Sequence, residues 1–140
     1  MTSALVRDVM TTDLITVSQF DTLETVSELF SDNNIHHLIV MDENQLVGIV
    51  SSTDLERAKH GKSLFINRNE EGLEEALLKS IYVGSIMTIN VESVKDTATL
   101  RQVYDQFKLN AYRCLPVLNE DQKLVGLITP IDLLDHVFKT

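Results

Sequence analysis

Two short motifs in this chain place a carboxylate three residues after a hydroxyl: Ser51-x-x-Asp54 and Thr129-x-x-Asp132. This spacing is typical of a helix capping box, in which each side chain accepts a hydrogen bond from the other residue's backbone N–H. Pro130, at the first expected helical position, agrees with that interpretation. The same geometry suits a ligand, because N–H groups at a helix start attract phosphate and a carboxylate can accept two hydrogen bonds from a ribose diol. The pattern predicts a helix start and leaves open whether a ligand also binds there.

The other reactive side chains do not support metal binding or catalysis. His36 and His37 are adjacent, and adjacent strand residues point to opposite faces, so the pair is not expected to chelate one ion. Cys114 is the only cysteine, which excludes an internal disulfide and a cysteine-based zinc site within one chain. It lies in an apolar segment, where a thiol is normally inert. The sequence has no Walker-type phosphate loop and no nucleophile elbow, so we expect no enzyme activity and no catalytic cofactor.

Composition restricts the class of partner. The formal net charge is −9, and the twelve Lys and Arg are scattered, so the surface would on average repel nucleic acid. Hydrophobic residues make up 44% and charged residues 24%, which is ordinary globular composition. Residues 1–14 do not resemble a basic-apolar leader, and no apolar run approaches the length of a membrane span. We expect a cytoplasmic protein that binds neither nucleic acid nor membrane.

An internal repeat is the strongest signal in the sequence. Residues 9–55 and 86–133 align in order, and Met10 recurs as Met87, 77 residues later. Gly48 recurs as Gly126, 78 residues later, so one residue has been inserted in the predicted turn Asn119–Lys123. We therefore divide the chain into a first repeat at 1–60, a linker loop and helix at 61–80, and a second repeat at 81–140.

Each repeat contains the same succession of periodic segments: a short strand, an amphipathic helix, two apolar strands joined by a polar turn, and a second helix. In the first repeat these are Ile15–Val17, Leu23–Phe30, Leu38–Met41, Leu46–Val50 and Thr53–Lys59. In the second they are Val91–Val94, Leu100–Phe107 (with Tyr104 on the apolar stripe), Leu115–Leu118, Leu124–Ile128 and Ile131–Phe138. Between the repeats we expect a mobile loop at His60–Asn69 and a connecting helix at Glu70–Ser80. Asn34 and Asn110 are expected near the ends of the first helices, because Asn tolerates the left-handed conformation.

Several of these segments together resemble the CBS-domain family over essentially the whole chain. They are the openings VMT (9–11) and IMT (86–88), the strand LPV (115–117), and the segments GIVSSTD (48–54) and GLITPID (126–132). Two ordered copies make the resemblance specific. It implies an α+β fold of two β-α-β-β-α CBS repeats packed with pseudo-twofold symmetry, with two clefts that in many members hold adenosine-containing ligands. Ile39 departs from the family pattern, because it stands where the LPV strand has proline.

The resemblance also implies which residues form the two clefts. One cleft would combine Ile15, Ile35 and His36 with Thr129 and Asp132. The other would combine Asn90, Tyr112 and Arg113 with Ser51, Thr53 and Asp54. In the family the Asp holds ribose, and a basic residue at or near the positions of His36 and Arg113 contacts phosphate. Arg113 is the better candidate, because its planar fork pairs with phosphate at any physiological pH.

These observations predict a regulatory module that senses an adenosine-containing ligand (AMP, ADP, ATP or S-adenosylmethionine) and signals to a separate effector protein. The alternative is a non-sensing dimerisation scaffold whose clefts are empty, because the capping box satisfies both interpretations. We also expect a homodimer, because an exposed apolar helix end is unusual on a small protein and the last predicted helix carries four crowded apolar residues: Leu133, Leu134, Val137 and Phe138.

Overall fold

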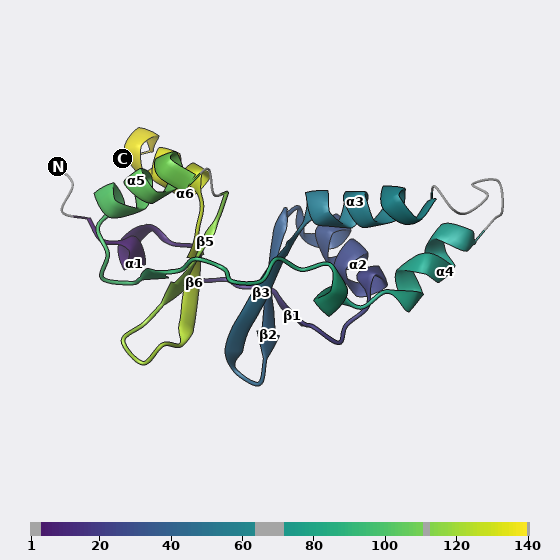
Figure 1. The fold of residues 1–140 in the computed structure, drawn as a ribbon. Coiled ribbons are helices and arrows are strands. Elements are labelled where there is room, and N and C mark those ends of the chain that lie inside the picture. Colours follow the sequence, from purple (N-terminus) through teal and green to yellow (C-terminus); the bar gives the residue numbers. More distant parts are fainter. Residues whose placement is uncertain (1–3, 64–71, 111–112, 140) are drawn as a thin grey trace. The chain divides into compact units, whose positions relative to one another are not determined.

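A computed structural model describes residues 4–63, 72–110 and 113–139 of the chain (Figure 1). Its helices are α1 (Val6–Val9), α2 (Leu23–Asn33), α3 (Ser52–Ser63), α4 (Leu73–Ser80), the 3-10 helix η1 (Val83–Ser85), α5 (Leu100–Asn110) and α6 (Pro130–Phe138). Its strands are β1 (Thr16–Ser18), β2 (His37–Asp42), β3 (Gln45–Ser51), β4 (Val94–Lys95), β5 (Leu115–Leu118) and β6 (Leu124–Ile128). The predicted α+β fold with two β-α-β-β-α repeats is confirmed.

Two three-stranded sheets have the same topology, β1-β2-β3 and β4-β5-β6. In each sheet the first pair of strands is parallel and the second pair is an antiparallel hairpin. The first hairpin turns through Glu43 and Asn44, which both have positive φ, as a tight two-residue turn requires. The second turn is one residue longer, as predicted, and the Asn119 side chain accepts hydrogen bonds from the backbone N–H groups of Asp121 and Lys123.

The chain forms two compact units whose bounds differ from those of the sequence repeats. The N-terminal unit is Ile15–Asn90, and the C-terminal unit consists of the described residues of Met1–Leu14 and Val91–Thr140. Backbone hydrogen bonds attach each opening segment to its unit: Thr11 pairs with Leu127 in the C-terminal unit, and Thr88 pairs with Ile49 in the N-terminal unit. Each unit therefore contains the opening segment of the other repeat.

Each unit has its own apolar core. In the N-terminal unit the buried cluster is Val17, Leu23, Val26, Leu38, Val40, Val50, Leu55 and Val83. In the C-terminal unit it is Val6, Val94, Val103, Phe107, Leu115, Val117 and Ile128. Val6 and Val83 are equivalent residues of the opening segments, and both are fully buried. The opening segments are thus part of the cores and do not merely connect the elements.

The two repeated glycines allow the opening segments to approach the sheets. A Cβ on Gly48 would lie 2.7 Å from the sulfur of Met87 and 2.8 Å from the backbone oxygen of Thr88. A Cβ on Gly126 would clash with the sulfur of Met10 and lie 3.1 Å from the backbone oxygen of Thr11. Such contacts are closer than real Cβ atoms tolerate, so only glycine fits both positions.

Most predicted elements are confirmed, and the differences are local. The strand predicted at Val91–Val94 is wrong in extent, because only Val94 and Lys95 pair with β5. The loop predicted from His60 begins later, since α3 continues to Ser63, and residues 64–69 lie outside the described residues. Tyr104 is 48% exposed and does not share the buried stripe of α5, which is Val103 and Phe107.

The helix ends and the connecting helix follow the prediction closely. Asn34 caps α2 in the left-handed conformation, and α5 ends at Asn110. The connecting helix begins at Leu73 and ends at Ser80. No helix in the described ranges has both the length and the apolar character that a membrane crossing requires.

Candidate functional site

Both predicted capping boxes are present, each at the junction between a hairpin and the following helix. In the N-terminal unit, the Ser51 N–H donates to Asp54 Oδ2 at 2.9 Å and the Asp54 N–H donates to Ser51 Oγ at 3.0 Å. In the C-terminal unit, the Thr129 N–H donates to Asp132 Oδ2 at 3.0 Å and the Asp132 N–H donates to Thr129 Oγ1 at 3.2 Å. Pro130 occupies the first turn of α6, as predicted. The four side chains are half-buried, so solvent or a ligand can still reach them.

Each capping bond uses Oδ2 of its carboxylate, and the remaining acceptor capacity differs between the two motifs. Asp54 Oδ1 lies 3.7 Å from the guanidinium of Arg57, one turn further along α3. Asp132 instead accepts from the hydroxyl of Thr11, at 3.2 Å to Oδ1 and 3.4 Å to Oδ2. A carboxylate offers about four lone-pair sites, so both groups retain capacity for hydroxyl donors from a ligand.

Sequence reasoning missed these two neighbours of the carboxylates. Arg57 could have been found, because residues three apart on a helix lie on the same face. Thr11 could not have been found from local pattern, since 121 residues separate it from Asp132. The N-terminal motif thus carries a cation, and the C-terminal motif carries a hydroxyl.

Other predicted residues of the N-terminal unit lie close to the start of α3. The backbone oxygen of His36 accepts from the Ser52 N–H at 3.0 Å, and His37 pairs with Ser51 across the β2–β3 ladder. The His36 side chain is exposed, and Ile35 is half-buried against the unit's core. The structure therefore brings Ile35 and His36 to the same end of the sheet as the Ser51 motif.

The remaining predicted residues of this unit are more dispersed. Ile15 is half-buried against the core just before β1. Thr53 is exposed in the first turn of α3, and Asn90 is exposed with a φ of 57° at the end of the unit. Only part of the predicted set therefore surrounds the start of α3 within this unit.

In the C-terminal unit, Arg113 is exposed two residues before β5 begins. Leu115 pairs with Ile128, so Arg113 and Thr129 flank the same end of that hairpin. Tyr112 lies outside the described residues. The clefts predicted above draw residues from both units, and their composition stays a prediction.

The thiol and the histidines offer no second kind of chemistry. Burial raises the pKa of Cys114 to about 12, so this thiol remains protonated at neutral pH and lacks the charge of a nucleophile or metal ligand. Within the described ranges, no group of three or more His, Cys, Asp or Glu side chains is placed to hold a metal ion. His36 precedes β2 and only His37 lies in the strand.

The fold and the two motifs define a class of protein built from a duplicated β-α-β-β-α unit with a hydroxyl and a carboxylate at each second helix start. The family model for the CBS domain matches residues 6–61 and 83–139. The chain therefore belongs to the CBS domain family, and the resemblance noted from its motifs is confirmed.

Two kinds of relative in sequence frame the family. A CBS domain-containing protein of Dictyostelium discoideum is 32% identical over 136 residues, which cover 96% of this chain and 92% of that protein. A homoserine O-acetyltransferase of Methanobrevibacter ruminantium is 31% identical over 97% of this chain, but the match covers only 24% of that protein.

Solved structures show the same arrangement. CBSX2 from Arabidopsis thaliana has a TM-score of 0.80 and 27% identity, and the match covers 99% of this chain and 96% of that chain. A structure of CBSX2 in complex with AMP has a TM-score of 0.78 and 26% identity over 96% of each chain. Both are CBS-pair proteins of nearly the same length as this chain.

Proposed function

We propose that this protein is a regulatory binding module that senses an adenosine-containing ligand and passes its occupancy to a separate effector protein. The observation that carries the proposal is the paired hydroxyl and carboxylate at the starts of α3 and α6, each with acceptor capacity beyond its cap. The AMP complex of CBSX2, a chain similar to this one over almost its full length, supports adenosine as the ligand class.

The proposal gives each residue a chemical role. Asp54 and Asp132 accept hydrogen bonds from a ribose diol, because an ionised carboxylate accepts strongly and repels phosphate. Ser51, Thr53 and Thr129 provide hydroxyls beside the N-termini of α3 and α6, where phosphate is favoured. Arg113 binds phosphate, His36 does so more strongly as the imidazolium, and three residues contact the nucleoside: Ile15, Ile35 and Asn90. Tyr112, next to Arg113 in the sequence, contacts the same ligand.

A thermal-shift panel with AMP, ADP, ATP, S-adenosylmethionine and NAD tests the proposal, with inorganic phosphate and guanosine monophosphate as controls. A ligand at a hundred times its dissociation constant should stabilise the fold by about 2.7 kcal/mol. We expect at least one adenosine compound to raise the unfolding midpoint while both controls leave it unchanged. No shift with any adenosine compound at millimolar concentration would contradict the proposal.

A non-sensing scaffold is the second candidate, and one observation favours it. Both carboxylates already have backbone partners without a ligand, so capping alone accounts for their place in the sequence. The scaffold predicts association between protein chains and no response to the panel. Acetyltransferase activity is not part of either candidate, because this chain spans only 24% of the matched acetyltransferase.

A further inference from the structure

Helix α6 presents an apolar stripe to solvent. Ile131, Leu134 and Phe138 follow one another at helical spacing on one face, and Val137 lies beside them. Ile131 is 61% exposed and Phe138 is 78% exposed. Leu133, by contrast, packs against the core of the C-terminal unit. We call the four exposed residues (Ile131, Leu134, Val137 and Phe138) the α6 stripe.

The internal repeat provides a control for this stripe within the same chain. Every position of the α6 stripe has an equivalent in α3, and each equivalent is polar: Thr53, Glu56, Lys59 and His60. The pattern extends to the neighbouring helix, where exposed Tyr104 and Leu109 of α5 stand in the places of Ser27 and Asp32 of α2. The α3 residues show that this fold does not need apolar side chains at these sites. Some other contact must account for them in the second repeat.

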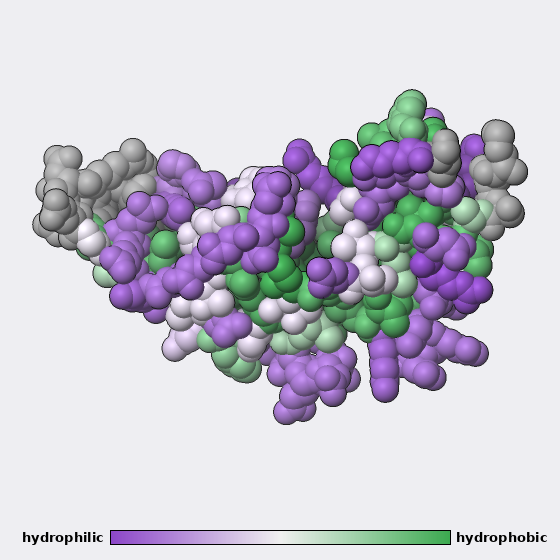
Figure 2. All heavy atoms as spheres, turned by 180° about the vertical axis from the view of Figure 1, so that it is seen from behind, coloured by the Kyte–Doolittle hydropathy of each residue, from purple (hydrophilic) through white to green (hydrophobic). Residues whose placement is uncertain are grey.

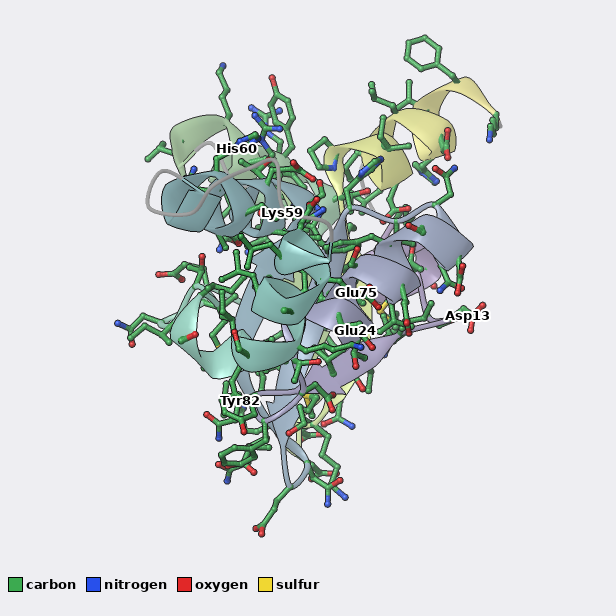
Figure 3. All side chains as sticks on the ribbon, turned by 90° about the vertical axis from the view of Figure 1, so that its right-hand side faces the viewer. Asp13, Glu24, Lys59, His60, Glu75 and Tyr82 are labelled. Atoms are coloured by element: carbon green, nitrogen blue, oxygen red, sulfur yellow. The ribbon has the colours of Figure 1, made fainter. Side chains whose placement is uncertain are left out.

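The helical layer of the N-terminal unit is covered by the chain itself. Helix α4 packs against α2 and α3 through Leu78. Two ion pairs border the contact, Lys79 with Glu24 at 3.7 Å and Lys59 with Glu74 at 3.5 Å (Figure 3). Among the described residues, no helix covers α5 and α6 in the corresponding way. Green hydrophobic surface lies at the upper right of Figure 2, where the C-terminal unit carries this layer.

The α5–α6 layer also lacks net charge. Arg101, Lys108 and Lys139 balance Asp105, Asp132 and Asp135, whereas the whole chain has a formal charge of −9. The cations of Arg101 and Lys108 lie 5.8 and 5.9 Å from the ring centre of Tyr104 and hold it between them. Two copies of a chain with charge −9 repel each other, so a neutral face is where they can meet at least electrostatic cost.

We propose that the α6 stripe is the contact surface between two copies of this chain, related by a twofold axis, and that the α2–α3 layer takes no part in that contact. The four side chains expose roughly 500 Å² of mostly apolar surface, which is large for a single patch on a monomer. With Tyr104 the patch approaches the ~800 Å² that each partner contributes to a standard interface. A twofold contact also suits a locally neutral face, because the same patch serves both partners. This inference does not depend on ligand binding.

Sedimentation equilibrium of the purified full chain tests the inference through the dissociation constant of the dimer. We expect the wild type to be a dimer at tens of micromolar, and Leu134→Glu to weaken it by roughly 30-fold or more, because the buried charge enters the contact twice. Phe138→His and Ile131→Thr, which copy the equivalent residues of the first repeat, should weaken it less. Glu56→Gln is the matched control, since it changes the charge by one at the position equivalent to Leu134, and it should leave the dimer intact.

Salt dependence provides a second readout that unfolding cannot imitate. Because each copy carries a charge of −9, added salt should screen their repulsion and tighten the dimer between about 50 and 500 mM. Circular dichroism verifies that each variant is folded. A wild-type mass of 15.8 kDa at a hundred micromolar would overturn the inference and leave the stripe to a different protein. Equal dimerisation of wild type and Leu134→Glu, or loss of the dimer in Glu56→Gln, would also overturn it.

Discussion

Replacement of Asp54 by Asn separates its structural role from its proposed role in binding. In the ligand-free protein, Asp54 accepts from the Ser51 N–H at 2.9 Å, and the amide oxygen of Asn can accept the same bond. The substitution also removes the ion pair with Arg57, but the Arg57 side chain is 76% exposed and such a pair contributes less than about 0.5 kcal/mol. Because Asn is as good a cap as Asp, the total loss of stability should be about 0.5–1 kcal/mol.

The expected loss of binding is larger. A carboxylate that grips a ribose diol makes charge-assisted hydrogen bonds, and their removal should cost about 1.5–3 kcal/mol, or roughly 10- to 150-fold in affinity. Isothermal titration calorimetry with the adenosine compound that gives the largest thermal shift measures this change. The unfolding midpoint of the same variant should fall by only about 2–5 °C.

Asp132→Asn provides the matched control for this experiment. It changes the equivalent carboxylate, which Thr11 contacts in place of an arginine. If one motif dominates binding, the two single variants will differ and the double variant will resemble the weaker of them. Unchanged affinity in both single variants and in the double variant would refute the ribose role and leave both carboxylates as caps.

Three further predictions concern the structure around the motifs. Gly126→Ala should destabilise the fold by about 1–3 kcal/mol, because its Cβ meets Met10 and the Thr11 backbone, and an unchanged midpoint in thermal unfolding would contradict that packing. Thr11→Val should cost about 1 kcal/mol by removing the hydroxyl that donates to Asp132, with Thr11→Ser retaining most of the stability in the same assay. The Cys114 thiol should react with a disulfide reagent only after unfolding, because burial raises its pKa to about 12. Since the unfolded thiol ionises near pH 9, this residue's contribution to stability should be complete below pH 9 and decline as the pH rises toward 12; rapid labelling of the folded protein at pH 8 would refute its burial.

The parts of the fold that follow from periodicity were predictable. Leu23 and Val26 at helical spacing became the buried face of α2, and the apolar runs at 38–41 and 115–118 became central strands. Such segments bury side chains through a local repeat, so their pattern is visible without the partner. Helix α1 and η1 were missed because four and three residues are too few to show a helical period.

Elements that depend on a partner were less predictable. The β-branched run at 91–94 resembles a strand, but β4 begins only at Val94 because only Val94 and Lys95 find partners in β5. Tyr104 was expected on the apolar stripe of α5, yet it points outward between two cations, because an aromatic side chain suits both a core and an exposed face.

The sequence alone determined the duplication, the α+β class and the two capping boxes, because each of these is written in short-range spacing. Only the tertiary structure showed that each opening segment packs in the unit of the other repeat, with Thr11 beside Leu127 and Asp132. It also showed that polar side chains of α3 are replaced by an exposed apolar stripe on α6. The physical reason is that a local pattern states what a segment can bury, whereas the partner it meets is decided by contacts more than a hundred residues away along the chain.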